Sequence, residues 1–347
     1  MAENNLLFML LWLGELTAAS WVLSYGAEHL SMKYGAKFVG RTLLSVATTL
    51  PEIAIVVYAA AGGFYGTAIG AGLGSNLLMM TLGLAIMLLV ATTRLSKSPL
   101  KGIDVSTFKL DKIFLLATAI VSALLFLDGY NYIDGFIFAG MFVAYLVMAL
   151  VEMQADKKKA KVAKTETAGG HKVVEVQHAQ VSSRTMLKAM LAFAAGTAGI
   201  FFGAGPFINS LEGFSTEVGI SVIILAVIIS PIAGEMPEKI SMILLARKGA
   251  AGASIAVANV LGSKILNNTL LLAVAVFGAM YHGGFFVSIE ANPILEYQMI
   301  LVTAVTLIAV GMMFKKEIGL KIGIILAVMY GISLVIQFLL PQDLTLH

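Results

Sequence analysis

The chain contains no cysteine and few charged residues. Its 347 residues include seven prolines, and only 12% are Asp, Glu, Lys or Arg. The absence of cysteine excludes disulfides, thiol catalysis and cysteine-ligated metal sites. The charged fraction is about half of the roughly 25% found in soluble domains. Because 59% of the residues are hydrophobic and the mean hydropathy is +0.92, a soluble fold of this length could not bury them, and the sequence predicts a membrane protein.

Hydrophobic runs of about 20 residues recur along the chain, and such a run spans a bilayer as a helix. They predict an all-α polytopic membrane protein with ten transmembrane helices. One long polar stretch, 153–186, is rich in lysine and predicts a flexible or amphipathic linker. The expected spans are 6–29, 40–61, 67–91, 112–127, 133–152, 187–208, 218–246, 252–280, 297–314 and 318–340.

The basic residues indicate an orientation. When the loops between the ten spans are taken alternately, one set holds 21 of the 23 Lys and Arg residues; the other holds none and carries acids such as Asp128 and Glu290. By the positive-inside rule, the basic loops face the cytoplasm. We therefore expect a cytoplasmic linker and both termini outside, in the plasma membrane. Orientation and lipid contact then explain the net charge of +3, so the bilayer, and no nucleic acid, is the expected partner.

Two stretches of the chain resemble each other. Each has a Pro-Glu in the middle of one span and a Gly-Ser in the middle of the next: Pro51-Glu52 with Gly74-Ser75, and Pro237-Glu238 with Gly262-Ser263. Five spans precede the linker and five follow it, so the two copies have opposite orientations. The sequence thus predicts two inverted five-helix repeats, a known transporter plan. They are residues 1–152, with the first repeat motif at about 39–91, and residues 187–347, with the second at about 218–280.

These motifs offer oxygen ligands inside the membrane. A proline within a helix frees the carbonyl four residues earlier, here those of Ala47 and Ala233. Charged groups inside a membrane are costly and indicate function, and carboxylate, carbonyl and hydroxyl oxygens suit Ca²⁺, Na⁺ or Mg²⁺. The candidate ligands are Glu52, Glu235, Glu238, Thr48, Thr49, Ala47, Ala233, Ser75, Asn76, Ser263, Asn267 and Asn268, with Lys264 as a candidate modulator.

The motifs also resemble those of a known family. Residues 26–57, with Thr48-Thr49-Leu50-Pro51-Glu52, and Gly74-Ser75-Asn76 resemble the first α-repeat of the calcium/cation antiporter superfamily; Ser230 to Ile240 with Gly262-Ser263 resembles the second. The resemblance implies a secondary-active antiporter of Ca²⁺ and Na⁺ or H⁺, with no cofactor and no obligate protein partner. It implies that Glu52 and Glu238 bind Ca²⁺ and that the first and sixth spans slide across the core. It also implies that Thr48, Thr49, Ser75 and Ser263 line the exchanging-ion sites.

The chain departs from the sodium/calcium branch of that family. Met79 and Lys264 stand where the branch usually has Asn, and Asn267 stands where it has Asp. Where the second repeat of that branch has a Thr-Ser pair, this chain has Gly234-Glu235. The segment from Ser230 to Glu238 looks more like the proton/calcium branch, whereas the first repeat looks more like the sodium/calcium branch. The coupling ion therefore stays open between Na⁺ and H⁺, and the substrate between Ca²⁺ and another divalent ion such as Mg²⁺ or Mn²⁺.

Several roles remain open on sequence alone. Lys264 either faces the site, where it mimics a bound monovalent ion, or only neutralises Glu235; Glu235 in turn either carries protons or pairs with Lys264 or Lys239. A cation channel is the alternative transport mode, although paired broken helices favour alternating access. An enzyme is not expected, because the chain has no His-Glu-x-x-His motif and its five histidines lie away from the span centres.

Overall fold

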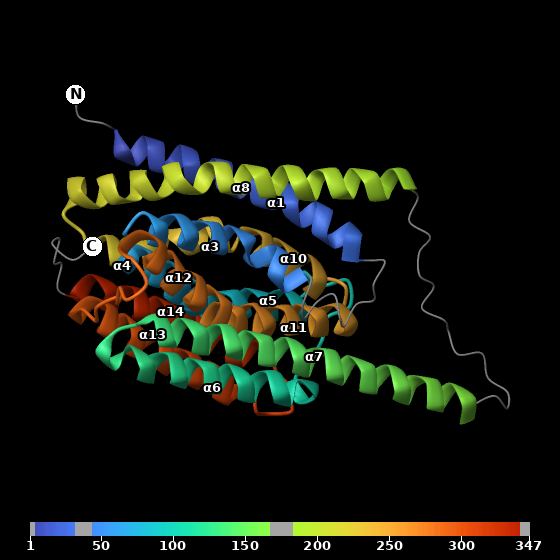
Figure 1. Cartoon of the computed structure of the whole chain (residues 1–347). Helices are drawn as coiled ribbons and strands as arrows, with labels where there is room; N and C mark the ends of the chain where they lie inside the picture. The colour runs from blue at the N-terminus through green and yellow to red at the C-terminus, as the bar shows by residue number, and fades with distance from the viewer. Residues whose placement is uncertain (1–3, 32–43, 167–182, 341–347) are drawn as a thin grey trace.

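The structure, a computed structural model, is almost entirely helical (Figure 1). It describes residues 4–31, 44–166 and 183–340. Two short strands, β1 (Ile103–Asp104) and β2 (Glu317–Ile318), accompany the helices. The helices are α1 (Asn5–Ser31), α3 (Leu44–Ala61), α4 (Tyr65–Leu78), η2 (Met79–Gly83), α5 (Leu84–Thr92), η3 (Ser106–Phe108), α6 (Lys109–Leu125), η4 (Phe126–Asp128), α7 (Tyr132–Glu166), α8 (Ser183–Val218), α9 (Val222–Gly234), α10 (Met236–Ala246), α11 (Ala250–Leu266), η5 (Asn267–Leu271), α12 (Leu272–Gly283), α13 (Pro293–Met312) and α14 (Leu320–Leu339).

Eight helical stretches in the described part of the chain are long and apolar enough to cross a membrane. They correspond to eight of the ten spans expected from the sequence. The other two, expected at 40–61 and 218–246, contain the shorter apolar helices Ala47–Ala61 and Val222–Gly234. The chain is thus an all-helical polytopic membrane protein, as the sequence predicts.

The expected span 218–246 is not one continuous helix. It contains α9 and α10, which meet at Glu235, a residue with φ −87° and ψ 1° that belongs to neither helix. Pro237 lies in the first turn of α10, where a missing N–H removes no intrahelical hydrogen bond. In the matching motif, α3 continues through Pro51. Two prolines in similar sequences therefore have different structural consequences.

The helices on either side of the predicted linker are longer than expected. α7 continues to Glu166 and α8 begins at Ser183 and extends to Val218, whereas the sequence suggests spans that end at 152 and 208. Residues 153–166 of the predicted linker are therefore helical. Its remaining central part, 167–182, lies outside the described residues.

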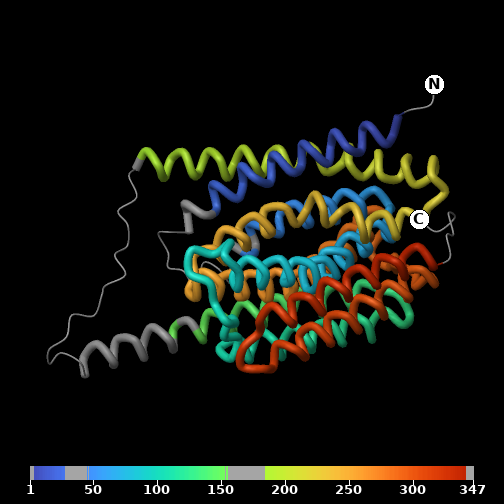
Figure 2. Tube along the Cα trace, turned by 180° about the vertical axis from the view of Figure 1, so that it is seen from behind, coloured from blue at the N-terminus to red at the C-terminus, as the bar shows by residue number. Residues whose placement is uncertain are grey.

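The helices form a central group flanked on two sides. Figures 1 and 2 show α1 and α8 running together along one side, with α6, α7, α13 and α14 on the opposite side. α1 and α8 approach so closely that a Cβ atom on Gly26 would lie 2.5 Å from the backbone nitrogen of Phe193, and one on Gly196 would lie 2.5 Å from that of Leu23. Glycine lets the two backbones meet, as in other membrane helix pairs.

The central helices include α4 and α11. Every residue from Gly66 to Leu78 of α4 is buried, and so is every residue from Ala256 to Leu266 of α11. A helix buried on all sides needs no polar face. Polar side chains on these two helices are therefore placed in the interior for a reason other than solubility.

Each of these two helices is followed by one π-helical segment. η2 begins at Met79, four residues after Ser75, and η5 begins at Asn267, four residues after Ser263. π segments inside α-helices are rare and occur often at functional sites. The two Gly-Ser motifs therefore share a local backbone feature as well as a sequence.

Two loop contacts join the halves of the chain. β1 pairs with β2 in antiparallel register, Ile103 opposite Ile318 and Asp104 opposite Glu317. An isolated bridge joins Tyr130 to Ile289. The first contact links the loops after the third and ninth expected spans, and the second links those after the fourth and eighth. If the first five spans are exchanged for the last five, each of the two contacts takes the position of the other.

Candidate functional site

Glu52 lies on α3 directly after Pro51, and its side chain is only 3% exposed. It packs against Gly234 at the end of α9: a Cβ atom at position 234 would lie 2.9 Å from Glu52 Cγ and 3.0 Å from its Cδ. The next residue in the chain is Glu235. Because Gly234 has no side chain, the carboxylate of Glu52 fits beside the helix break. The break itself carries a second carboxylate, that of Glu235.

Glu235 lies in the break between α9 and α10 and is completely buried. One of its oxygens, Oε1, accepts hydrogen bonds from the hydroxyl of Ser75 on α4 and from the ammonium group of Lys264 on α11. The Lys264 contact is also an ion pair. Three separate elements thus meet at this carboxylate.

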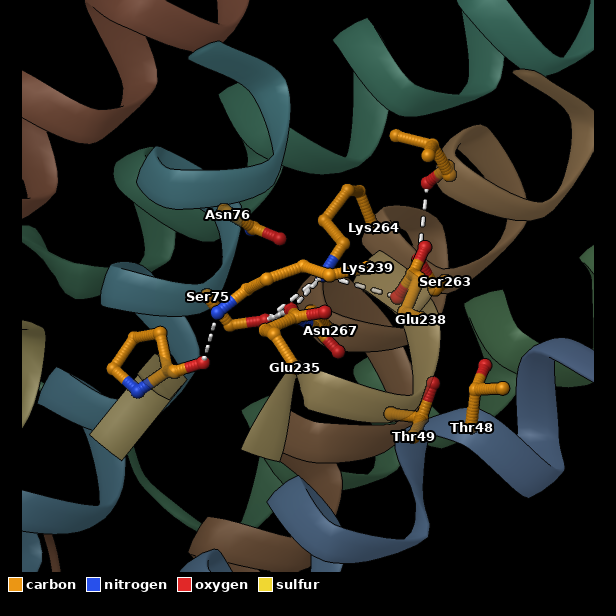
Figure 3. A network of polar contacts seen from close by, with 12 residues as sticks. Thr48, Thr49, Ser75, Asn76, Glu235, Glu238, Lys239, Ser263, Lys264 and Asn267 are labelled. Carbon is orange, nitrogen blue, oxygen red and sulfur yellow. Dashed lines mark hydrogen bonds and ion pairs between the residues drawn. The ribbon is translucent and has the colours of Figure 1, made fainter. Parts of the chain in front are cut away.

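Glu238 lies in the first turn of α10 and is 1% exposed. Its Oε1 accepts a 2.6 Å hydrogen bond from the Ser263 hydroxyl, and its Oε2 lies 3.8 Å from Lys264 Nζ. Figure 3 shows the Lys264 ammonium group between the carboxylates of Glu235 and Glu238. Of the two lysines that the sequence offers as partners of Glu235, Lys264 forms the ion pair. Lys239 instead donates to the carbonyl of Pro231 at 3.1 Å.

Amide side chains extend the polar cluster between the two halves. The amide nitrogen of Asn267 lies 2.6 Å from Ser75 Oγ, and Asn76 donates to Asn268 at 2.5 Å. Lys264 Nζ donates to Ser75 Oγ at 2.8 Å. Ser75 therefore joins the first half of the chain to three residues of the second.

Thr48 and Thr49 are buried on α3 and lie at a distance from the contacts around Lys264 (Figure 3). Their hydroxyls donate to the carbonyl of Ser45, at 3.2 Å from Thr48 and 2.6 Å from Thr49. Ser45 in turn donates to Asn259 Oδ1 on α11 at 3.1 Å. The sequence reasoning missed Asn259, although a buried amide in an apolar span is itself a signal. Ala47 and Ala233 are buried as well.

Each of the three buried carboxylates has one oxygen that makes no hydrogen bond: Oε2 of Glu52, of Glu235 and of Glu238. An ionised group in a low-dielectric interior is costly unless it is paired. The arrangement can therefore attract a cation. Within the described residues, no three His, Cys, Asp or Glu side chains are grouped closely enough to hold a metal ion, so a cation here needs hydroxyl, amide or backbone oxygens too.

Replacing Gly234 by alanine is expected to displace the Glu52 carboxylate. The new methyl group would lie closer to Glu52 than the roughly 3.5–4.0 Å of an ordinary carbon contact. We expect the affinity of the site for a divalent cation to fall by about tenfold, which corresponds to about 1.4 kcal/mol. Gly331→Ala is the control, because a Cβ there meets nothing within 4 Å. Equal affinities in the two variants would show that Gly234 does not position Glu52.

Comparison with known proteins identifies the family. The fold is that of a polytopic membrane protein with charged side chains buried at its centre. The model of the sodium/calcium exchanger protein family matches residues 5–151 and 188–339, and the chain belongs to that family. The resemblance to the calcium/cation antiporter superfamily is thereby confirmed.

Three similar proteins each match most of this chain. An uncharacterized membrane protein of Methanocaldococcus jannaschii is 21% identical over 311 residues, 89% of this chain and 90% of the relative. The crystal structure of the H⁺/Ca²⁺ exchanger CAX has a TM-score of 0.76 at 20% identity, over 98% of this chain and 82% of that one. A structure of the sodium-calcium exchanger NCX_Mj has a TM-score of 0.62 at 21% identity, over 96% and 99%. At these identities the two structures establish the fold alone.

Proposed function

We propose that the chain is a secondary-active antiporter that exchanges Ca²⁺ for Na⁺ or H⁺ by alternating access. The observation that carries the proposal is the set of three buried carboxylates, Glu52, Glu235 and Glu238, each with an oxygen that lacks a hydrogen bond. Buried negative charge inside a membrane protein favours a cation pathway. Membership of the exchanger family, and the fold shared with a H⁺/Ca²⁺ and a sodium-calcium exchanger, support the same reading.

In this proposal Glu52 and Glu238 are the central ligands of the divalent cation. Oxygen-rich sites without thiolate or imidazole suit Ca²⁺, with Mg²⁺ and Mn²⁺ as the alternatives. The other proposed ligands of the transported ions are Glu235, the hydroxyls and amides of Thr48, Thr49, Ser75, Asn76, Ser263 and Asn267, and the carbonyls of Ala47 and Ala233.

The proposal includes two inverted five-helix repeats, 1–152 and 187–347, that carry the repeat motifs at about 39–91 and 218–280. The matching π segments η2 and η5 support this arrangement, and so do the two corresponding loop contacts. The separation of basic from acidic loops supports a plasma-membrane orientation with a cytoplasmic 153–186 segment and external termini.

The test is Ca²⁺ uptake into proteoliposomes that contain the purified full chain. An outward Na⁺ gradient and an outward proton gradient are applied separately, with empty liposomes as control. We expect saturable uptake that depends on one of the two gradients. Competition by Mg²⁺ and Mn²⁺ then ranks the divalent substrates.

Two results would contradict the proposal. Uptake that neither saturates nor depends on a counter-ion gradient would indicate a channel. Absence of divalent uptake with either gradient, from folded protein, would remove the Ca²⁺ antiporter assignment.

A further inference from the structure

Lys264 is surrounded by oxygen atoms although it lies at the centre of a membrane protein. Its side chain is 1% exposed. The ammonium nitrogen bonds to Ser75 Oγ at 2.8 Å and to Glu235 Oε1, and it lies 3.8 Å from Glu238 Oε2. These oxygens come from α4, from the α9–α10 break and from α10, so the lysine connects both halves of the chain.

Asn267 completes this environment. Its amide nitrogen lies 2.6 Å from Ser75 Oγ, and when the amide is turned by half a rotation its oxygen lies 3.3 Å from Lys264 Nζ. The ammonium group then has hydroxyl, carboxylate and amide oxygens around it. Such oxygens are the ligands that hard metal cations take in proteins. The ammonium group therefore lies where a small cation would be coordinated.

Negative charges outnumber positive charges around the Lys264 ammonium group. Glu52, Glu235 and Glu238 supply three carboxylates, and Lys264 supplies one ammonium group in contact with two of them. With all four ionised, the sum is two negative charges, and the ammonium group of Lys239, which donates to the carbonyl of Pro231 and also interacts electrostatically with the three carboxylates, reduces it to one. Without the ammonium group of Lys264, the same cluster would require one further positive charge.

We propose that Lys264 is a tethered cation that fills a monovalent-cation subsite formed by Ser75, Glu235 and Asn267, and so lowers by one the number of counter-ions exchanged per divalent cation. This inference rests on the proposed antiport function and specifies how its central site is divided. Ser75, Glu235 and Asn267, named above among the ligands of the transported ions, then hold the ammonium group instead, and Glu52 and Glu238 remain for the transported ions. A purely structural ion pair between Lys264 and Glu235 is the competing explanation.

The transport experiment measures the coupling ratio from the reversal potential of Ca²⁺ flux in proteoliposomes, with the counter-ion, Na⁺ or H⁺, whose gradient drives uptake by the wild type. We expect Lys264→Ala to exchange one more counter-ion per Ca²⁺ than the wild type. Lys112→Met is the matched control: Lys112 is also a buried lysine, but its ammonium group bonds to the carbonyls of Val105 and Met313, away from the site. Its ratio is expected to equal that of the wild type.

A binding experiment tests the subsite without transport. The thermal unfolding temperature of each purified protein is measured in NaCl and in N-methylglucamine chloride. Because a ligand that binds only the folded state stabilises it, Lys264→Ala is expected to gain a Na⁺-dependent rise that is larger than that of the wild type. Lys264→Asn, the residue that the sodium/calcium branch usually has at this position, replaces Lys264→Ala if the latter does not fold, because its shorter side chain leaves room for a cation.

An unchanged coupling ratio together with an unchanged Na⁺ response in the folded variant would overturn the tethered-cation proposal and leave Lys264 as a structural partner of Glu235. Absence of coupled Ca²⁺ flux in the wild type would instead contradict the proposed function. In that case the gain or absence of Na⁺ stabilisation in Lys264→Ala still decides whether the subsite exists.

Discussion

Glu52→Gln is expected to abolish coupled cation transport and to leave the protein at least as thermally stable as the wild type. The substitution keeps the size of the side chain, so the packing against Gly234 is retained. It removes a buried negative charge whose Oε2 has no hydrogen-bond partner. Removal of an unpaired buried charge does not destabilise a fold, whereas a cation loses one of its central ligands.

The size of the transport effect follows from Coulomb's law. Two unit charges about 4 Å apart interact by about 4 kcal/mol at an effective dielectric constant near 20, and a divalent ion doubles this. Even a third of that energy corresponds to a loss of about 100-fold. Initial uptake rates in proteoliposomes measure the effect. Saturable uptake at the wild-type rate would remove Glu52 from the ion pathway.

Glu235→Gln provides the contrast, because it makes the same chemical change in a different environment. It removes the carboxylate to which the ammonium group of Lys264 is bonded in the wild type and leaves Glu238, 3.8 Å away, as its remaining charged partner. Breaking a buried ion pair from one side costs about 3–5 kcal/mol. The unfolding temperature of Glu235→Gln should therefore fall below that of Glu52→Gln.

Gly74→Ala is expected to prevent stable folding. A Cβ atom there would lie 2.1 Å from the carbonyl oxygen of Val227 and 2.6 Å from its carbonyl carbon and Cα. These are backbone atoms of α9, so no side-chain rotation relieves the overlap and α4 must move away. Overpacking commonly costs about 1–3 kcal/mol and sometimes more, and contact with backbone places this case at the upper end.

The same helix offers a matched control for this substitution. At Gly72, two residues earlier on α4, a Cβ atom would meet only the end of the Leu271 side chain, at 3.1 Å. The yield of monodisperse protein in detergent and its unfolding temperature are compared for the two variants. If Gly74→Ala were as stable as Gly72→Ala, the close contact between α4 and α9 would not be required.

The hydrophobic runs predicted the all-helical membrane fold because span length is set by bilayer thickness. They did not predict the break at Glu235. Pro51 and Pro237 occur in similar motifs, yet α3 continues through the first and α10 begins at the second. Packing of Gly234 against Glu52 is a contact between distant segments, and no local pattern contains it. The helix break is therefore a tertiary property.

The candidate site was predictable as a set of residue types but not as a set of contacts. Intramembrane carboxylates and hydroxyls in paired motifs are visible in the sequence. Which of two lysines pairs with Glu235 depends on distance in space, and the structure places Lys264 there although Lys239 is nearer along the chain. The proposed ion-binding roles of these residues remain predictions for the experiments above.

The loop contacts constrain the motions that are available to the proposed transport cycle. β1 with β2, and Tyr130 with Ile289, each link a segment of the first half to one of the second. Backbone hydrogen bonds of this kind resist relative tilting of the helices that they connect. α1 and α8 contact α3, α9 and α10 and carry neither of these links. Neither link therefore opposes a shift of α1 and α8, the motion that the family resemblance implies, and that motion stays a prediction.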